Sequence, residues 1–119
     1  MITEKDIIVS EKDPLQATPL TYFLKCSKIT ATCFTPDSFS PAELNYEPPL
    51  VILDIENNPD RILQLTNEIT KNLSRTKIIA ICNDAERYET RLFEAGCSAV
   101  LRNPLNFHVF LIQLNELLG

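Results

Sequence analysis

The sequence predicts an α/β domain in which a five-stranded parallel sheet is covered by helices on both faces. Short apolar runs, rich in β-branched residues, alternate from end to end with windows of helical spacing. Several of these runs are continuously apolar, which is typical of parallel strands that are buried on both faces. With 119 residues the chain has room for one such domain, and we expect residues 1–119 to form a single unit.

The first half of the chain contains three expected strands separated by less regular segments. Helical spacing is found in residues 14–25, where Pro19 is expected to kink or restart the helix. A stretch rich in turn residues, 35–48, leaves room for one short helix after Pro41. The expected strands are residues 6–10, 29–34 and 49–54, the last of which runs into Asp54.

The second half alternates more clearly between the two kinds of element. Residues 58–59 are an Asn-Pro pair, a side-chain N-cap with proline at the first helical position. Residues 83–84 cap a further helix that reaches Ala95, and Gly96 stands where a C′ glycine belongs. The expected strands are residues 77–82 and 99–101, and a last helix is expected at 104–118. The first of the helices has a one-sided apolar stripe, made of Ile62, Leu65, Ile69 and Leu73.

The composition excludes several classes of function. Two glycines in the whole chain cannot supply a glycine-rich phosphate loop. A net charge of −5 without a basic cluster argues against direct nucleic acid binding by this segment. No run approaches the ~20 apolar residues of a membrane span, and the first residues lack the apolar core of a signal peptide. We therefore expect a cytoplasmic domain that binds neither nucleic acid nor membrane.

The four cysteines are expected to be small buried hydrophobic residues in a reducing compartment. They form no C-x-x-C pair, and the one histidine of the chain, His108, is distant from most of them in sequence. A zinc site therefore has little support, and no cofactor is expected. The cysteines are Cys26, Cys33, Cys82 and Cys97.

Polar residues follow the expected strands at their carboxyl ends, where ligands of doubly wound sheets gather. This rim contains no nucleophile–histidine pair, so the sequence does not predict an enzyme. Its members are Glu11, Lys12 and Asp13 after the first strand, Asp54 after the third, Cys82 and Asn83 after the fourth, and Arg102 and Asn103 after the fifth.

These features resemble the response-regulator receiver domain of two-component signalling, which has a flavodoxin-like, doubly wound (βα)5 sandwich. Residues 11–14 take the place of the acidic pair that follows the first strand, and Asp54 takes that of the phosphoacceptor. Cys82 falls where receivers end the fourth strand in Ser or Thr. Residues 95–97 are similar to the turn before the fifth strand, and residues 103–104 to the Lys-Pro after it. The resemblance covers nearly the whole chain and implies a role in signal transduction.

Four departures from the receiver pattern predict a pseudo-receiver, which keeps the fold and acts without phosphorylation. Lys12 places an ammonium where a metal-binding carboxylate belongs, and we expect it to form a salt bridge with Asp54. Asn103 replaces the lysine that pairs with the phosphoryl group, so that only an inward-reaching Arg102 could supply a cation. The remaining departures are the thiol of Cys82 and the absence of an aromatic ring at Val100.

The alternative reading is a phosphorylation-competent receiver. Asp54 would then accept a phosphoryl group from a histidine kinase, and Glu11, Asp13 and Asp54 would hold Mg²⁺. Such a domain would have only the autophosphorylation and autodephosphorylation activities of receivers. Under the first reading, the pseudo-receiver, we expect the chain to be a whole small protein or the N-terminal part of a transcription regulator.

If phosphorylation is lost, function depends on protein contacts, and we expect a homodimer through the last two helices. Val109 and Ile112 lie off the predicted core stripe of the last helix and are expected to be exposed. That core stripe consists of positions 107, 110, 111, 114, 117 and 118. The preceding helix has exposed residues of both signs suited to symmetric pairing, namely Glu86, Arg87, Glu89, Arg91 and Glu94.

Overall fold

The central sheet has five parallel strands in the order β2-β1-β3-β4-β5. The computed structural model describes residues 7–10, 31–34, 40–43, 47–54, 59–82, 85–102 and 106–118. Within it, the strands are β1 (Ile7–Ser10), β2 (Ala31–Phe34), β3 (Leu50–Asp54), β4 (Lys77–Cys82) and β5 (Ala99–Arg102). The strand order changes direction between β1 and β3, which is the doubly wound arrangement of flavodoxin-like folds. The predicted α/β class is confirmed.

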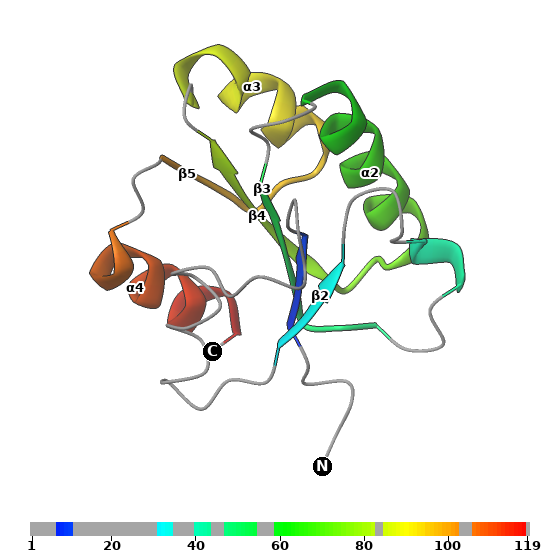
Figure 1. Ribbon diagram of the computed structural model, residues 1–119, viewed down its shortest axis with the longest axis horizontal. Helices are drawn as coiled ribbons and strands as arrows, with labels where there is room; N and C mark the ends of the chain where they lie inside the picture. Colours follow the sequence, from blue (N-terminus) through cyan, green and yellow to red (C-terminus); the bar gives the residue numbers. More distant parts are fainter. Residues whose placement is uncertain are drawn as a thin grey trace.

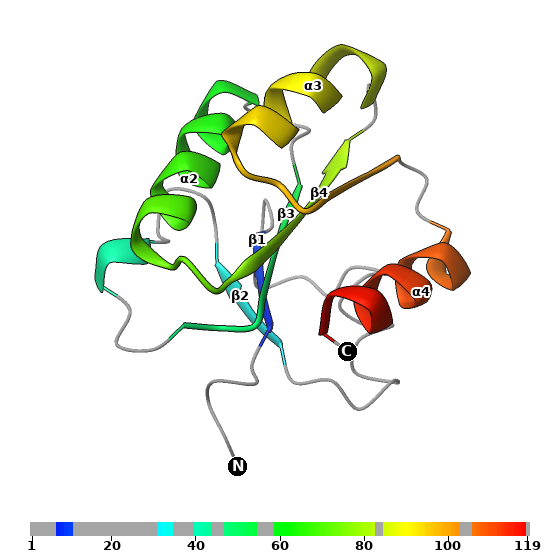
Figure 2. The ribbon, with the colours of Figure 1, turned by 180° about the vertical axis from the view of Figure 1, so that it is seen from behind.

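Helices cover both faces of this sheet. The helices are α2 (Pro59–Asn72), α3 (Ala85–Ala95) and α4 (Phe107–Leu118), with a short 3₁₀ helix η2 (Pro41–Glu43). Helices α2 and α3 lie on one face and α4 on the other (Figures 1 and 2). The short helix predicted after Pro41 is confirmed as η2, whereas the helix predicted at residues 14–25, with Pro19, lies outside the described residues.

The two central strands supply an apolar cluster to each face of the sheet, because successive strand residues point in opposite directions. Val51 and Leu53 of β3 belong to the cluster beneath α2 and α3, whereas Leu50 and Ile52 belong to the cluster beneath α4. All four side chains are fully buried. The strand β4 alternates in the same way, so the continuous apolar runs of the sequence correspond to strands covered on both faces.

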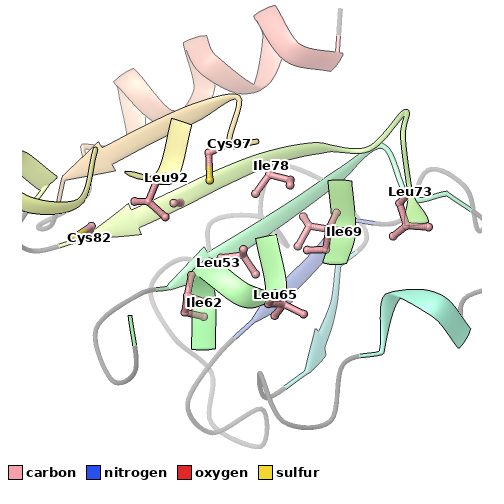
Figure 3. Close-up of a cluster of buried hydrophobic side chains, with 11 residues drawn as sticks. Leu53, Ile62, Leu65, Ile69, Leu73, Ile78, Cys82, Leu92 and Cys97 are labelled. Atoms are coloured by element: carbon pink, nitrogen blue, oxygen red, sulfur yellow. The ribbon is translucent and has the colours of Figure 1, made fainter. Parts of the chain in front are cut away.

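The cluster beneath α2 and α3 contains the apolar stripe predicted for the first of these helices (Figure 3). The four residues of the stripe are buried, and the last of them, Leu73, follows the final residue of α2. Helix α4 buries Phe110 and Leu114 against the opposite face. Burial of one such side chain contributes roughly 1.5–3 kcal/mol to folding, so these helices are held mainly by apolar packing.

Gly96 ends α3 in a left-handed conformation, with φ of 123°. Its amide donates a hydrogen bond to the carbonyl oxygen of Phe93, and the amide of Cys97 donates one to that of Leu92. This pair of bonds is the Schellman arrangement, in which the residue after the helix requires positive φ. The predicted C′ glycine is therefore confirmed.

Two details of α4 differ from the sequence prediction. The helix begins at Phe107 and not at residue 104, because the Asn106 side chain caps it. The Asn106 Oδ1 accepts hydrogen bonds from the amides of His108 (3.0 Å) and Val109 (3.2 Å). Leu111, which was predicted to belong to the core stripe, is 38% exposed, because the buried side of the helix is centred on Phe110 and Leu114.

Candidate functional site

The carboxyl ends of the parallel strands meet along one edge of the sheet, where the polar rim is predicted. Ser10, the last residue of β1, pairs with Leu53, and Asp54 follows at the end of β3. Asp54 in turn pairs with Ile81, one position before the end of β4. Backbone register thus places the end of β3 in the centre of this edge, between β1 and β4. The side chain of Asp54 lies outside the described part of the structure.

Several predicted rim residues cannot be placed relative to Asp54. Glu11, Lys12, Asp13 and Asn103 lie outside the described residues. Within the described ranges, no group of three or more His, Cys, Asp or Glu side chains is arranged to hold a metal ion. The predicted Mg²⁺ ligands Glu11, Asp13 and Asp54 therefore remain a prediction from the sequence.

Cys82 ends β4 at this edge, and its side chain is buried at 2% exposure. It forms no disulfide and lies within the apolar cluster beneath α2 and α3 (Figure 3). A thiol is a weak hydrogen-bond donor compared with a hydroxyl. The end of β4 thus presents a small, buried and weakly polar group.

Arg102, at the end of β5, is directed to the neighbouring helix. Its Nη2 lies 3.4 Å from Oε1 of Glu86 in the first turn of α3, and its side chain is 63% exposed. An exposed ion pair of this kind contributes about 0–1 kcal/mol to stability. Arg102, which the sequence suggested as a cation for the rim, is thus paired with Glu86 at the surface instead.

Cys97 is the second described thiol, and it is distinct from the rim because it precedes β5. Burial raises the pKa of the Cys97 thiol to about 11, while a hydrogen bond with Thr66 acts in the lowering direction. The thiol is therefore protonated at neutral pH and a poor nucleophile. The two cysteines whose side chains are described, Cys82 and Cys97, are buried, as the sequence predicts, and neither forms a disulfide.

The two arginines among the predicted interface residues of α3 interact within the chain. Arg91 lies 3.9 Å from Asp60 of α2, and the guanidinium groups of Arg87 and Arg91 lie 5.4 and 6.0 Å from the centre of the Tyr88 ring. The arginines are thus engaged within the chain, on the side of α2. Glu89 and Glu94 are exposed on the same helix.

The predicted interface residues of α4 are at the surface. Val109 is 43% exposed and Ile112 is 44% exposed, which confirms the expectation that both lie off the core stripe. His108 is also exposed, as expected for a histidine away from the rim. Three of the four large apolar side chains described as exposed belong to α4, the third being Leu111.

Comparison with known proteins identifies the fold. No family model matches the chain, and no curated protein matches it. Several solved structures do match it. A response regulator receiver protein from Burkholderia phymatum superposes with a TM-score of 0.74 at 24% identity, covering 96% of this chain and 94% of that one. A CheY-like response regulator receiver domain protein from Methanospirillum hungatei gives 0.81 at 19% identity, covering 96% and 93%. A two-component response regulator from Clostridium difficile gives 0.81 at 16% identity, covering 96% and 95%.

The chain has the receiver-domain fold.

In this fold, Asp54 is the last residue of the central strand β3. Cys82 and Arg102 are the last residues of the next two strands, β4 and β5. None of the helices in the described part of the chain is long and apolar enough to cross a membrane.

Sequence reasoning missed the partners of the charged residues. It identified Arg102 as a rim residue and Arg91 and Glu86 as interface residues, but it did not predict the pairs Arg102–Glu86 and Arg91–Asp60. Both carboxylates stand in the first turn of a helix that follows a strand. The helix dipole favours acidic residues in the first turn. The sequence could therefore have indicated that these two carboxylates lie near the rim.

Proposed function

We propose that this domain is a receiver-type signalling module that acts through protein contacts and without phosphorylation. The proposal is best supported by the surroundings of Cys82 and Arg102, two predicted rim residues whose side chains are described. Cys82 is buried among apolar side chains, and Arg102 is paired with Glu86 at the surface. Transfer of a phosphoryl group to a carboxylate requires cationic groups directed at the charge that develops. Neither of these side chains provides one.

The sequence at the rim supports the same proposal. Lys12 follows β1 where receivers have a carboxylate, and Asn103 follows β5 where they have a lysine. We propose that the Lys12 ammonium pairs with Asp54 and takes the place of the metal ion. Such a pair would hold the domain in one state without a phosphoryl group.

The second candidate is a phosphorylation-competent receiver. It is favoured by Asp54 at the end of the central strand and by Glu11 and Asp13 close behind β1 in the sequence. Carboxylate oxygens are the protein ligands that Mg²⁺ prefers, and a histidine kinase would be the phosphoryl donor. Even then the domain would have no enzymatic activity beyond its own phosphorylation and dephosphorylation.

Protein partners are the expected route of output in either case. We propose a homodimer through α3 and α4, which is supported by the exposed Val109 and Ile112. A histidine kinase or an output domain is a further candidate partner, and the chain would serve alone or as the N-terminal part of a transcription regulator. We place it in the cytoplasm, without direct nucleic acid binding by this segment, in keeping with its net charge of −5.

Beryllofluoride binding distinguishes the two candidates. The protein is titrated with beryllofluoride and Mg²⁺ while amide resonances are followed by NMR, and it is separately incubated with acetyl phosphate and analysed by intact mass. We expect no Mg²⁺-dependent shift and no added phosphoryl group. A phosphoryl adduct that is present in the native chain and absent from the Asp54→Asn variant would establish the second candidate instead.

A further inference from the structure

Three exposed residues of α4 form a stripe along its outer surface that is inclined to the helix axis, as every row of residues spaced by four is. His108, Ile112 and Glu116 follow one another at intervals of four residues, so they lie one helical turn apart on one side. All three are exposed, Ile112 at 44%. None of the ion pairs found between described residues involves His108 or Glu116.

The two polar ends of the stripe are placed against the dipole of their own helix. His108 stands in the first turn, where acidic side chains are favoured, and Glu116 stands in the last turn, where basic ones are favoured. The stability of α4 alone therefore does not account for their positions. If a second helix packs alongside in the opposite direction, its C-terminal end lies next to His108 and its N-terminal end next to Glu116. Each side chain is then close to a helix end whose dipole favours it.

We infer that α4 packs in an antiparallel sense against α4 of a second copy of this chain, with the two helix axes crossing at roughly 50° about a two-fold axis at Ile112. The inference rests on the homodimer of the proposed function and assigns its contact to α4. Each end of the stripe lies about 6 Å along the axis from Ile112. The two-fold axis therefore brings His108 opposite the partner's Glu116, and Glu116 opposite the partner's His108. An imidazole can donate a hydrogen bond to a carboxylate in either protonation state.

Charge favours a second copy through α4 over one through α3. Two chains of net charge −5 repel each other over most of their surfaces. Helix α4 has a single formal charge, that of Glu116, and it is the one charge that the two-fold axis pairs. Helix α3 has three glutamates against two arginines, and Arg91 already meets Asp60. A copy that approached α3 would face unpaired carboxylates.

The contact is limited to one pair of short helices, so the dimer is expected to be weak. Interfaces well below about 1,200 Å² belong to transient complexes. Sedimentation equilibrium over a wide range of protein concentration is therefore the suitable measurement. The native chain is compared with His108→Glu, Glu116→Lys and the double variant that contains both changes. Glu89→Lys, which makes the same charge change on exposed α3, is the matched control.

His108→Glu should weaken the dimer by about tenfold, because it places a new carboxylate of each copy opposite the partner's Glu116. Glu116→Lys should weaken it as well, because it removes the two carboxylates that accept hydrogen bonds from the imidazoles. The double variant should dimerise as well as the native chain, and so should an equimolar mixture of the two single variants. Glu89→Lys should leave the dimer unchanged. Both single substitutions suit the dipole of α4, so their melting temperatures should not fall, which separates lost association from lost folding.

Three results would overturn the inference. Failure of the double variant to recover the dimer would exclude the antiparallel arrangement. A change in dimerisation caused by Glu89→Lys, but not by the α4 variants, would move the contact to α3 and leave the homodimer of the proposed function in place. A native chain that remains monomeric at every concentration would exclude both. The proposal of phosphorylation-independent signalling is tested separately by beryllofluoride.

Discussion

The hydroxyl of Thr70 on α2 lies against Gly96 at the end of α3 and leaves no room for a side chain there. Thr70 Oγ1 is 2.9 Å from the carbonyl oxygen of Thr66 and 3.3 Å from that of Ala95. A Cβ added at Gly96 would overlap this hydroxyl. The ends of the two helices are thus joined at a point where only glycine satisfies both the backbone and the available space.

Gly96→Ala should therefore destabilise the domain by about 2–4 kcal/mol, from the positive φ together with the overlap. Urea denaturation followed by far-UV circular dichroism gives the change in the free energy of unfolding. Combining it with Thr70→Ala removes the overlap but keeps the strained φ, so the double variant should recover part of the loss. A Gly96→Ala variant as stable as the native chain would contradict the assigned close approach.

Phe110→Ala should destabilise the domain by about 3–5 kcal/mol, because Phe110 is fully buried between α4 and the sheet. Phe93→Ala is the matched control, since Phe93 is a phenylalanine on α3 with 45% exposure. We expect the control to cost less than about 1 kcal/mol in the same urea denaturation experiment. Equal losses for the two variants would mean that α4 is not packed as described.

Cys97 should make stability depend on pH between about 9 and about 11, because burial raises its pKa to about 11. Its folded pKa is higher than its unfolded pKa, so the stability it contributes is present below about pH 9 and is lost as pH rises through the folded value. A shift of this size corresponds to at most about 2–3 kcal/mol. Lysine and tyrosine residues also titrate in this range, so the relevant quantity is the difference between the native chain and Cys97→Ala.

The difference in unfolding free energy between the native chain and Cys97→Ala should become smaller as pH rises from 8 to 11. The same burial predicts that Cys97 reacts with iodoacetamide at pH 8 much more slowly than a thiol in the unfolded chain. Mass spectrometry of peptides after timed labelling gives that rate. Rapid labelling of Cys97 in the folded protein would show that it is accessible.

Rebuilding the receiver rim should create a metal-dependent response that the native chain lacks. The double variant Lys12→Asp, Asn103→Lys restores the acidic pair after β1 and the lysine after β5. Under the proposed function, it should bind beryllofluoride in the presence of Mg²⁺ and show NMR shifts around β3 and β4. The added Asp54→Asn change should abolish these shifts. Equal binding by the native chain and the double variant would favour the phosphorylation-competent reading.

Most of the sheet could be predicted because its strands are continuously apolar and bounded by polar residues. Strand β4 is found at the predicted residues, and β5 differs only by including Arg102. The start of α4 was placed three residues early, because Pro104 is a typical first helical residue and the competing cap at Asn106 is a single side chain. Local preferences of similar strength cannot be ranked from sequence alone.

The rim and the surface were less predictable, because they depend on tertiary geometry. The sequence identified Arg102 as a rim residue, but its pairing with Glu86 depends on how α3 lies against β5. Leu111 was assigned to the core because it is apolar and adjacent to Phe110, and a small rotation of the helix about its axis exposes it. Patterns of apolar residues specify which side of a helix is buried only to within about one residue position.

The division of β3 and β4 between two apolar clusters limits how this chain can change during evolution. Val51 and Ile52 are neighbours in sequence but belong to opposite faces of the sheet. Inserting or deleting a single residue within β3 would send every later side chain of the strand to the wrong face. Substitutions that keep side-chain volume can be absorbed there, whereas length changes cannot. Insertions and deletions among descendants of this sequence should therefore fall in the connections between elements and leave the lengths of the central strands unchanged.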